Sequence, residues 1–295
     1  MEKNLAVITV LLGALFMSFN GLLIRLIDVA NGFQILFYRS ITLALIIYIV
    51  ATVKRRISLK KFICTFDKWD LRVGLCLSLA FSSYVFSIIY TTVASTLFIL
   101  ATAPLLASLI SWILLNEVPK RATISSMILS LLGVFFMVYG GFDSGGHIGN
   151  LLAIIAAFSF AMSLVLARKS SKSDVLNGTF IGGVLSGFFG LCIAQFGDYG
   201  LSVNLSDLII MLLMGGLAIG LGITLVYLAT PFLSAPEVSV LVLLESLLGP
   251  VWVWLFLGYP MSLKELWGGF FVFMAVLSLA YFSSKENHPV NLKKL

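Results

Sequence analysis

Ten runs of about twenty mostly apolar residues follow one another along this chain of 295 residues. An α-helix rises about 1.5 Å per residue, so a helix of this length crosses the hydrocarbon core of a bilayer. The runs lack the alternating pattern of membrane barrel strands, and short polar or Gly-rich breaks separate them. We therefore predict an all-α membrane protein with ten transmembrane helices, at residues 5–24, 33–53, 71–89, 93–115, 122–140, 148–167, 178–196, 207–227, 237–257 and 265–282.

Composition excludes the main soluble classes. Charged residues make up 11% of the chain, whereas a soluble domain carries about 25% to cover its surface. The remaining surface must face lipid, so the bilayer is an expected partner. A soluble enzyme, a disordered scaffold and a nucleic-acid binder are excluded despite the basic pI near 9.2.

The basic residues predict the orientation of the spans. With the N-terminus in the cytoplasm, sixteen Lys and Arg residues lie on the cytoplasmic side, only Arg25 and Lys264 lie outside, and Arg39 lies within the second span. Cytoplasmic loops of membrane proteins are enriched in Lys and Arg, so we predict that both termini are cytoplasmic. The first run lacks an A-x-A cleavage site, so we expect it to remain as a span. The basic stretch 54–72 is expected to be a cytoplasmic loop or a short helix on the lipid surface.

The two halves of the chain share a weak internal repeat. A shift of 142 residues aligns 111–117 with 253–259, and a shift of 143 aligns Arg25 with Arg168. Each half then has five spans, and an odd number gives the two halves opposite topology in the membrane. Inverted repeats around a midplane site are typical of secondary transporters. The predicted units are residues 1–142, residues 143–284 and a polar cytoplasmic tail at 285–295.

Three segments resemble a known family. FQILFYRSITLA at 33–44, APLLASLISWILLNE at 103–117 and ESLLGPVWVWLFLGYP at 245–260 occur in the order and spacing of the drug/metabolite transporter superfamily, EamA type. This resemblance implies a transporter of small metabolites, often an exporter of amino acids, with a central cavity between two five-helix halves. The chain departs from the family pattern at Ser246, where the family has proline, and at Tyr259, the counterpart of Glu117.

Two ionisable residues lie deep within the predicted spans. Glu245 is near the centre of the ninth span, where a charge costs about 2.5–3.5 kcal/mol unless it is paired, protonated or hydrated. It is a candidate for contact with a substrate amine or for proton exchange, and the alternative is a structural ion pair. Arg39 in the second span can pair with Glu245, bind a substrate carboxylate, or reach the interface as a structural residue. The sequence leaves open whether the two side chains meet.

Several other side chains within the spans are candidate substrate ligands. A transport cavity needs a few polar groups among apolar and aromatic walls, although isolated Ser, Asn and Tyr residues in membrane helices also join helices to one another. Asn20 and Tyr84 rank first because the resemblance implies that their spans line the cavity. The complete candidate set for substrate binding is Glu245, Asn20, Tyr84, Tyr227, Ser246 and Trp112, with Arg39 and Glu245 as a coupling or ion pair.

The sequence predicts no metal site, catalytic group or cofactor. Cys64, Cys76 and Cys192 have no metal-binding spacing, and His147 and His288 lie outside the apolar core of the spans. No phosphate-binding GxxxxGK[ST] motif is present, which argues against ATP-driven transport. We therefore expect a protein that is not an enzyme, and an intramembrane lipid-modifying enzyme is a distant alternative.

These observations together predict a secondary transporter. We expect an exporter or exchanger of a small polar metabolite, such as an amino acid or a derivative, that works by alternating access around a central cavity. The expected location is the bacterial plasma (inner) membrane. An uncoupled facilitator or channel is the alternative function. Coupling to protons, transport direction, and a monomeric or homodimeric state are left open.

Overall fold

The chain folds into a bundle of long helices. The computed structural model describes residues 3–91, 96, 99–138, 147–170, 172, 175–197, 200–258 and 263–285. The α-helices are α1 (Lys3–Arg25), α2 (Gly32–Arg55), α3 (Leu59–Cys64), α4 (Lys68–Tyr90), α6 (Ala103–Leu115), α7 (Arg121–Val138), α8 (His147–Lys169), α9 (Leu176–Phe196), α10 (Leu205–Leu213), α11 (Gly222–Ala229), α12 (Ala235–Val242), α13 (Leu244–Leu257) and α14 (Leu263–Lys285). A π-helix, η1 (Met214–Leu221), joins α10 to α11, and a 3-10 turn, η2 (Thr230–Phe232), follows α11.

The predicted fold class, a helical membrane protein, is confirmed. Seven helical segments in the described ranges are long and apolar enough to cross a bilayer, and three shorter apolar helices occur at 103–115, 121–133 and 266–282. These ten segments correspond in order to the ten predicted spans. The expected boundary between the two halves, at 142 and 143, and the tail beyond 285 lie outside the described residues, so the division of the chain stays a prediction.

Local capping explains where several helices begin. α2 starts after Asn31, whose side chain accepts hydrogen bonds from the backbone N–H groups of Phe33 and Gln34. The Gln34 side chain accepts in return from the backbone N–H of Asn31, which completes a capping box. Asp67 and Asp70 form the same motif at α4, and Ser234 and Glu237 form it at α12.

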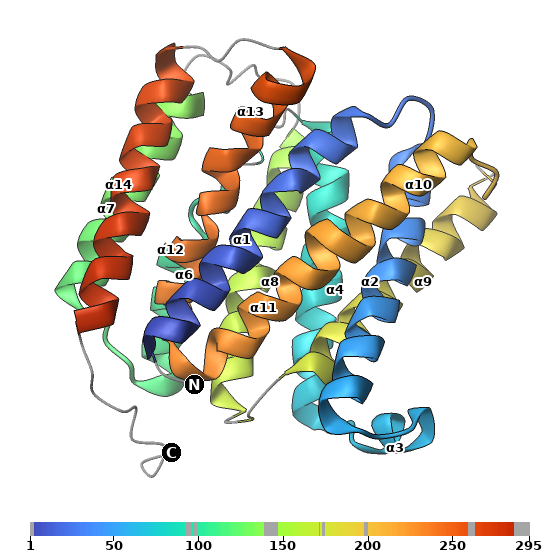
Figure 1. Cartoon of the computed structure of the whole chain (residues 1–295), viewed down its shortest axis with the longest axis horizontal. Coiled ribbons are helices and arrows are strands. Elements are labelled where there is room, and N and C mark those ends of the chain that lie inside the picture. Colours follow the sequence, from blue (N-terminus) through green and yellow to red (C-terminus); the bar gives the residue numbers. More distant parts are fainter. Residues whose placement is uncertain are drawn as a thin grey trace.

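The two ends of the bundle differ in charge. α1 begins, α2 ends and α4 begins at the end that carries α3, at the bottom of Figure 1. Lys3, Arg55 and Lys68 mark these helix ends. We call this the basic end. At the opposite end, the carboxylate of Asp207 accepts hydrogen bonds from three backbone N–H groups at 28–30 and so fixes the loop between α1 and α2.

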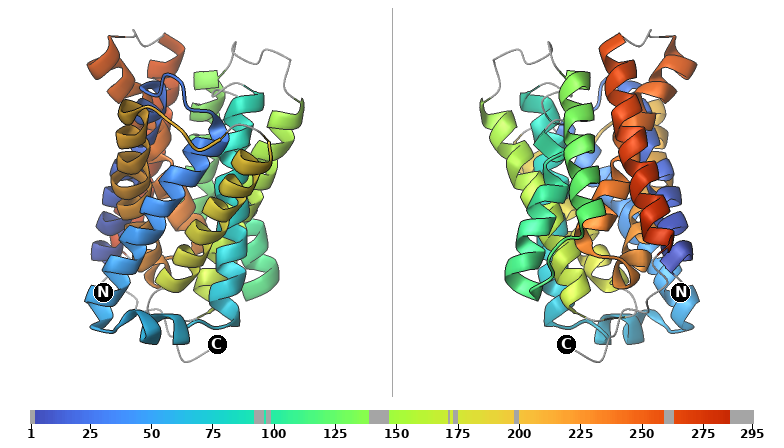
Figure 2. Two further views of the ribbon diagram at one scale, coloured as in Figure 1. Left: turned by 90° about the vertical axis from the view of Figure 1, so that its right-hand side faces the viewer. Right: turned by 90° about the vertical axis from the view of Figure 1, so that its left-hand side faces the viewer.

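The two halves of the chain make matching helix contacts. If a span of the first half packs on a span of the second half, their counterparts also pack on each other. α1 packs on α11 and α13, and its counterpart α8 packs on α4 and α6. α2 packs on its own counterpart α9, and α7 packs on α14, a pair that lies along one flank of the molecule (Figures 1 and 2). α1 runs away from the basic end, whereas α8 runs towards it. The helices are therefore arranged as inverted repeats.

The end of the fourth span also shows the register of this repeat. Asn116 is the C-cap residue that follows α6 and Gly258 is the C-cap residue that follows α13, and the two positions are separated by 142 residues. Both residues adopt the left-handed conformation, with φ of 54° and 71°. This conformation closes a helix C-terminus and is favourable for Gly and tolerated by Asn.

Glycines allow the closest helix crossings. Helices in a bilayer gain little from the hydrophobic effect, so small residues that let the backbones approach drive their packing. A Cβ atom at Gly13 would lie 2.7 Å from the carbonyl oxygen of Gly222, where α1 crosses α11. Gly74 is also confined where α4 crosses α9, because a Cβ there would lie 2.5 Å from the Ile181 side chain and 3.0 Å from the carbonyl oxygen of Gly178.

Gly13→Ala is expected to destabilise the protein, because the methyl group would force α1 away from α11. Overpacking of this kind costs about 1–3 kcal/mol. Gly21→Ala, in the same helix, is the matched control, since a Cβ there meets nothing within 4 Å. The midpoint of thermal unfolding of the purified protein in detergent should fall for Gly13→Ala and stay or rise for Gly21→Ala. Equal midpoints for the two variants would contradict this account of the crossing.

Candidate functional site

A cavity of about 120 Å³ lies in the middle of the bundle. Its walls come from both halves of the chain, since α1, α2, α4 and α6 face α8, η1, α11, α12 and α13 across it. Most of the lining is apolar: Met17, Ala80, Phe81, Leu100, Ala103, Ala156, Phe160, Ile219, Ile223, Val242 and Leu243. The polar lining residues are Asn20, Arg39, Tyr84, Ser239, Glu245 and Ser246.

Two helical spans that line the cavity are interrupted beside it. A turn at 101–102 precedes α6, and the Thr102 N–H donates to the Ile99 carbonyl at 3.0 Å. Leu243 separates α12 from α13, and its N–H donates to the Val240 carbonyl at 3.1 Å. A shift of 142 residues places the turn at 101–102 on residues 243–244. The two interruptions therefore occupy equivalent positions in the two halves, to within one residue. Interrupted helices near the midplane form the binding sites of many transporters.

Glu245 is the second residue of α13 and lies directly after this interruption. Its side chain is half-buried and lines the cavity. Within the described residues, neither a hydrogen bond nor an ion pair is formed by its carboxylate. The 142-residue shift matches Glu245 with Ala103, so only the second half of the chain supplies an acid here.

Arg39 lies across the cavity on α2 and is only 3% exposed. Its Nη2 donates to the carbonyl oxygen of Phe81 at 3.1 Å. No ion pair joins Arg39 to Glu245 in the described part of the chain, so the question left open by the sequence is answered for this conformation. The cavity thus contains one guanidinium and one carboxyl side chain that do not contact each other directly.

Tyr84 and Asn20 line the same cavity as Arg39 and Glu245. The Tyr84 hydroxyl is next to the Asn20 side chain and is within electrostatic range of both Arg39 and Glu245. Asn20 is buried, and its Oδ1 atom has no hydrogen-bond partner among the described residues. An unpaired buried acceptor of this kind costs free energy, so it marks a position where a donor from a ligand would be stabilised.

Ser239 is a cavity residue that the sequence analysis did not single out. It lies on α12, is 2% exposed, and its Oγ has no partner in the described structure. The sequence does contain a pattern that indicates this residue. Ser239 precedes Ser246 by seven residues in the same apolar run and therefore shares a helix face with it. Both residues lie on the cavity wall.

Two of the predicted candidates lie elsewhere. Tyr227 is completely buried on α11, and its hydroxyl forms a hydrogen bond with Ser163 of α8. Trp112 is 57% exposed on the outside of α6. Of the seven predicted residues, Asn20, Arg39, Tyr84, Glu245 and Ser246 line the cavity, and these two do not.

The comparison with protein families identifies the chain. The sequence model of the EamA-like transporter family matches residues 4–139 and again residues 147–281. The chain belongs to the EamA-like transporter family. The two matches correspond to the helices that the inverted contacts relate to one another.

Two further comparisons found similar proteins. The transporter is 30% identical over 108 residues to an "Uncharacterized transporter" from Archaeoglobus fulgidus, a match that covers 35% of this chain and 34% of that protein. One solved structure, described only as a crystal structure of a protein, superposes with a TM-score of 0.78 at 14% identity. That superposition covers 94% of this chain and 98% of the other, and it shows a shared fold.

Metal ligands are not clustered in this EamA-like transporter. Among the described residues, no group of three or more His, Cys, Asp and Glu side chains is placed to hold a metal ion.

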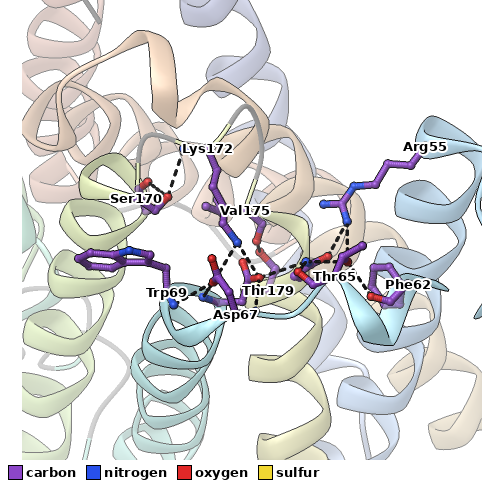
Figure 3. Close-up of polar contacts among 12 residues, drawn as sticks. Arg55, Phe62, Thr65, Asp67, Trp69, Ser170, Lys172, Val175 and Thr179 are labelled. Atoms are coloured by element: carbon purple, nitrogen blue, oxygen red, sulfur yellow. Dashed lines mark hydrogen bonds and ion pairs between the residues drawn. The ribbon is translucent and has the colours of Figure 1, made fainter. Parts of the chain in front are cut away.

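A polar cluster ties the two halves of the transporter together at the basic end (Figure 3). Lys172, in the segment between α8 and α9, binds Asp70 at 2.7 Å and Asp67 at 2.9 Å. Asn177 of α9 donates to Asp70 at 3.1 Å and accepts from Arg55 at 2.7 Å. We call these five residues the basic-end cluster.

Hydrogen bonding shifts the pKa values in this cluster. Burial alone would raise the pKa of Asp67, but hydrogen bonds from the backbone of Asp70, from Lys172 and from the backbone of Trp69 lower it below 3.8. Burial alone would lower the pKa of Lys172, but its bonds to Asp70 and Asp67 raise it above 10.5. The stabilisation by Asp67 is complete above pH 3.8 and is lost as the pH falls through the lowered pKa. The stabilisation by Lys172 is complete below pH 10.5 and is lost as the pH rises through the raised pKa. Both contributions are therefore present at neutral pH.

Lys172→Met and Asp70→Asn are expected to destabilise the transporter non-additively at neutral pH, because the two side chains share one contact. A double-mutant cycle on thermal unfolding should give a coupling free energy of about 0.5–3 kcal/mol. Lys61→Met, at an exposed position of the same end, is the control and should leave the midpoint unchanged. Additive effects of the two substitutions would show that the contact is absent.

Proposed function

We propose that this EamA-like transporter is a secondary carrier of a small zwitterionic metabolite, such as an amino acid or a derivative, acting as an exporter or exchanger. One observation carries the proposal: Arg39 and Glu245 line the same cavity, and no ion pair joins them among the described residues. Each of these charges is stabilised if a ligand brings its partner. A ligand with one carboxylate and one ammonium group brings both.

The polar lining suggests how such a ligand binds. The planar guanidinium of Arg39 suits a carboxylate, because it donates two parallel hydrogen bonds. Glu245 and the unpaired Oδ1 of Asn20 are acceptors, which suits an ammonium group. Tyr84 and Ser246 supply orienting hydrogen bonds, and the apolar walls accommodate the rest of the molecule.

Alternating access follows from the inverted halves. If each half adopted the helix packing that the other half has now, one end of the bundle would close and the other would open around the fixed cavity. The present conformation has ion pairs across the basic end, among them Lys3–Glu237 at 3.2 Å and Arg168–Glu117 at 2.9 Å. We infer that the basic end is cytoplasmic, with both termini there, in the plasma membrane of a bacterium.

Glu245 also supports a second candidate, a carrier coupled to protons. A half-buried carboxylate that has no partner among the described residues can bind a proton in one conformation and release it in the other. The two candidates differ in whether an imposed pH gradient drives accumulation, and an uncoupled facilitator would show exchange without such accumulation.

Glu245→Gln is expected to abolish or strongly reduce counterflow. The experiment uses proteoliposomes preloaded in turn with each amino acid of a panel, and it measures accumulation of the same radiolabelled compound. Loss of a charge-assisted hydrogen bond of about 1.5–3 kcal/mol corresponds to a loss of binding of about ten- to a hundredfold. Asp28→Asn is the matched control, since it removes an exposed acid outside the cavity. Full counterflow in Glu245→Gln would contradict a substrate contact at Glu245.

Arg39→Lys is expected to retain the fold and to raise the half-saturating substrate concentration, because an ammonium group cannot donate the two parallel hydrogen bonds of a guanidinium. The effect should be larger for an amino acid than for the corresponding amine, which lacks the carboxylate. Competition of unlabelled amino acid and amine against the labelled substrate measures this difference. An equal loss for both competitors would contradict carboxylate binding at Arg39.

A further inference from the structure

A second cavity, of about 250 Å³, lies at the basic end. Its polar walls come from the end of α6, the segment 117–120, the end of α8 and the start of α12. Lys3, Glu117, Arg168 and Glu237 line it, together with Ser111. We call it the basic-end cavity, and the cavity described above is the central cavity.

The two cavities are neighbours along the same two helices. On α12, Glu237 lines the basic-end cavity and Ser239 lines the central cavity, and these two residues are separated by a rise of about 3 Å. On α6, Ala103 and Ser111 lie in the central and basic-end cavities, about 12 Å apart. The residues that line the two cavities are therefore separated by about two helical turns along α6 and by less than one turn along α12.

Ser111 is a buried hydroxyl on the wall of the basic-end cavity. It is 1% exposed, and its Oγ has no partner among the described residues. Ser239, in the central cavity, has the same property. Leaving a buried polar group unpaired costs about 1–3 kcal/mol, so both hydroxyls are placed where a passing polar ligand would satisfy them.

The charged groups of the basic-end cavity have both signs. Arg168 binds both carboxylate oxygens of Glu117 at 2.9 Å through Nε, and its Nη1 donates to the Leu233 carbonyl at 2.6 Å. Lys3 binds Glu237 at 3.2 Å. A zwitterion can replace such a pair without leaving a net buried charge, because its carboxylate takes the place of one partner and its ammonium group takes the place of the other.

We propose that the basic-end cavity is a second binding station for the substrate of the central cavity. The substrate carboxylate binds Arg168 in place of Glu117, the ammonium group pairs with the released Glu117, and Ser111 donates a hydrogen bond. This inference rests on the proposed function, because it takes the ligand to be the same zwitterion. Binding there separates Arg168 from Glu117 and so loosens the closure between α8 and the segment after α6.

The internal repeat does not supply an equivalent charged pair at the opposite end of the bundle. The shift of 143 residues matches Arg168 with Arg25, at the opposite end of the bundle. The shift of 142 matches Glu117 with Tyr259, which lies outside the described residues. Tyrosine carries no charge at neutral pH, so an arginine–carboxylate pair between these two counterparts is not possible.

The test compares three variants that each remove one buried, unpaired hydroxyl. Ser111→Ala removes it from the basic-end cavity, Ser239→Ala from the central cavity, and Ser126→Ala from α7, where Ser126 lines neither of the two cavities described. Uptake is measured in membrane vesicles of both orientations, with each proteinogenic L-amino acid in turn as the radiolabelled probe. The readout is the half-saturating concentration from each side.

Ser111→Ala should raise the half-saturating concentration about two- to tenfold from the basic side and leave the value from the opposite side unchanged. Glu117→Gln should also change the half-saturating concentration measured from the basic side. Ser126→Ala should leave the half-saturating concentration unchanged from both sides. Equal effects of Ser111→Ala from both sides, or none, would overturn the second station while the central site stands. Absence of uptake of every probe by the wild-type protein would overturn both the proposed function and this inference.

Discussion

The hydrocarbon core of a bilayer offers no water to an unbonded peptide group, and this constraint determines where the transporter can hold a site. An interrupted helix is tolerated at membrane depth only where protein or a hydrated cavity covers the freed backbone groups. Two spans are interrupted here, at 101–102 and at Leu243, and both interruptions border the central cavity. The position of the cavity thus follows from the two breaks, and the glycine crossings of α1 with α11 and of α4 with α9 hold the surrounding helices close.

The two halves share a backbone plan but differ in the side chains that carry charge. The break in the second half brings Glu245 into the cavity, and the equivalent position in the first half is Ala103. At the ends of the same spans, Glu117 binds Arg168, whereas its counterpart is Tyr259. Two identical halves would make the inward-open and outward-open conformations equal in energy. The substitutions at these equivalent positions remove that equality, and a carrier can then favour one conformation in the absence of substrate.

Sequence alone predicted the helical spans because their length and apolarity depend on the bilayer rather than on tertiary contacts. It also identified five residues of the cavity, since a charged or polar side chain within a span stands out against an apolar background. It did not predict the rotation of each helix, because an almost uniformly apolar span has no polar face that marks its inner side. For this reason the candidate set included Trp112, which faces outward, and Tyr227, which bonds Ser163, along with the higher-ranked Asn20 and Tyr84. The π-helix at 214–221 gave no sequence signal.

The separation of Arg39 from Glu245 has a consequence for selectivity. The pair leaves the cavity with no net charge when both groups are ionised, so a ligand of net charge zero enters without creating a buried excess charge. A simple amine would satisfy Glu245 but leave Arg39 unpaired, and a simple carboxylate would do the reverse. An unpaired buried charge is costly, so each partial ligand is penalised at the group it does not reach. Under the proposed function, selection for the complete zwitterion would arise from the two unsatisfied groups together, and the apolar wall would distinguish one side chain from another.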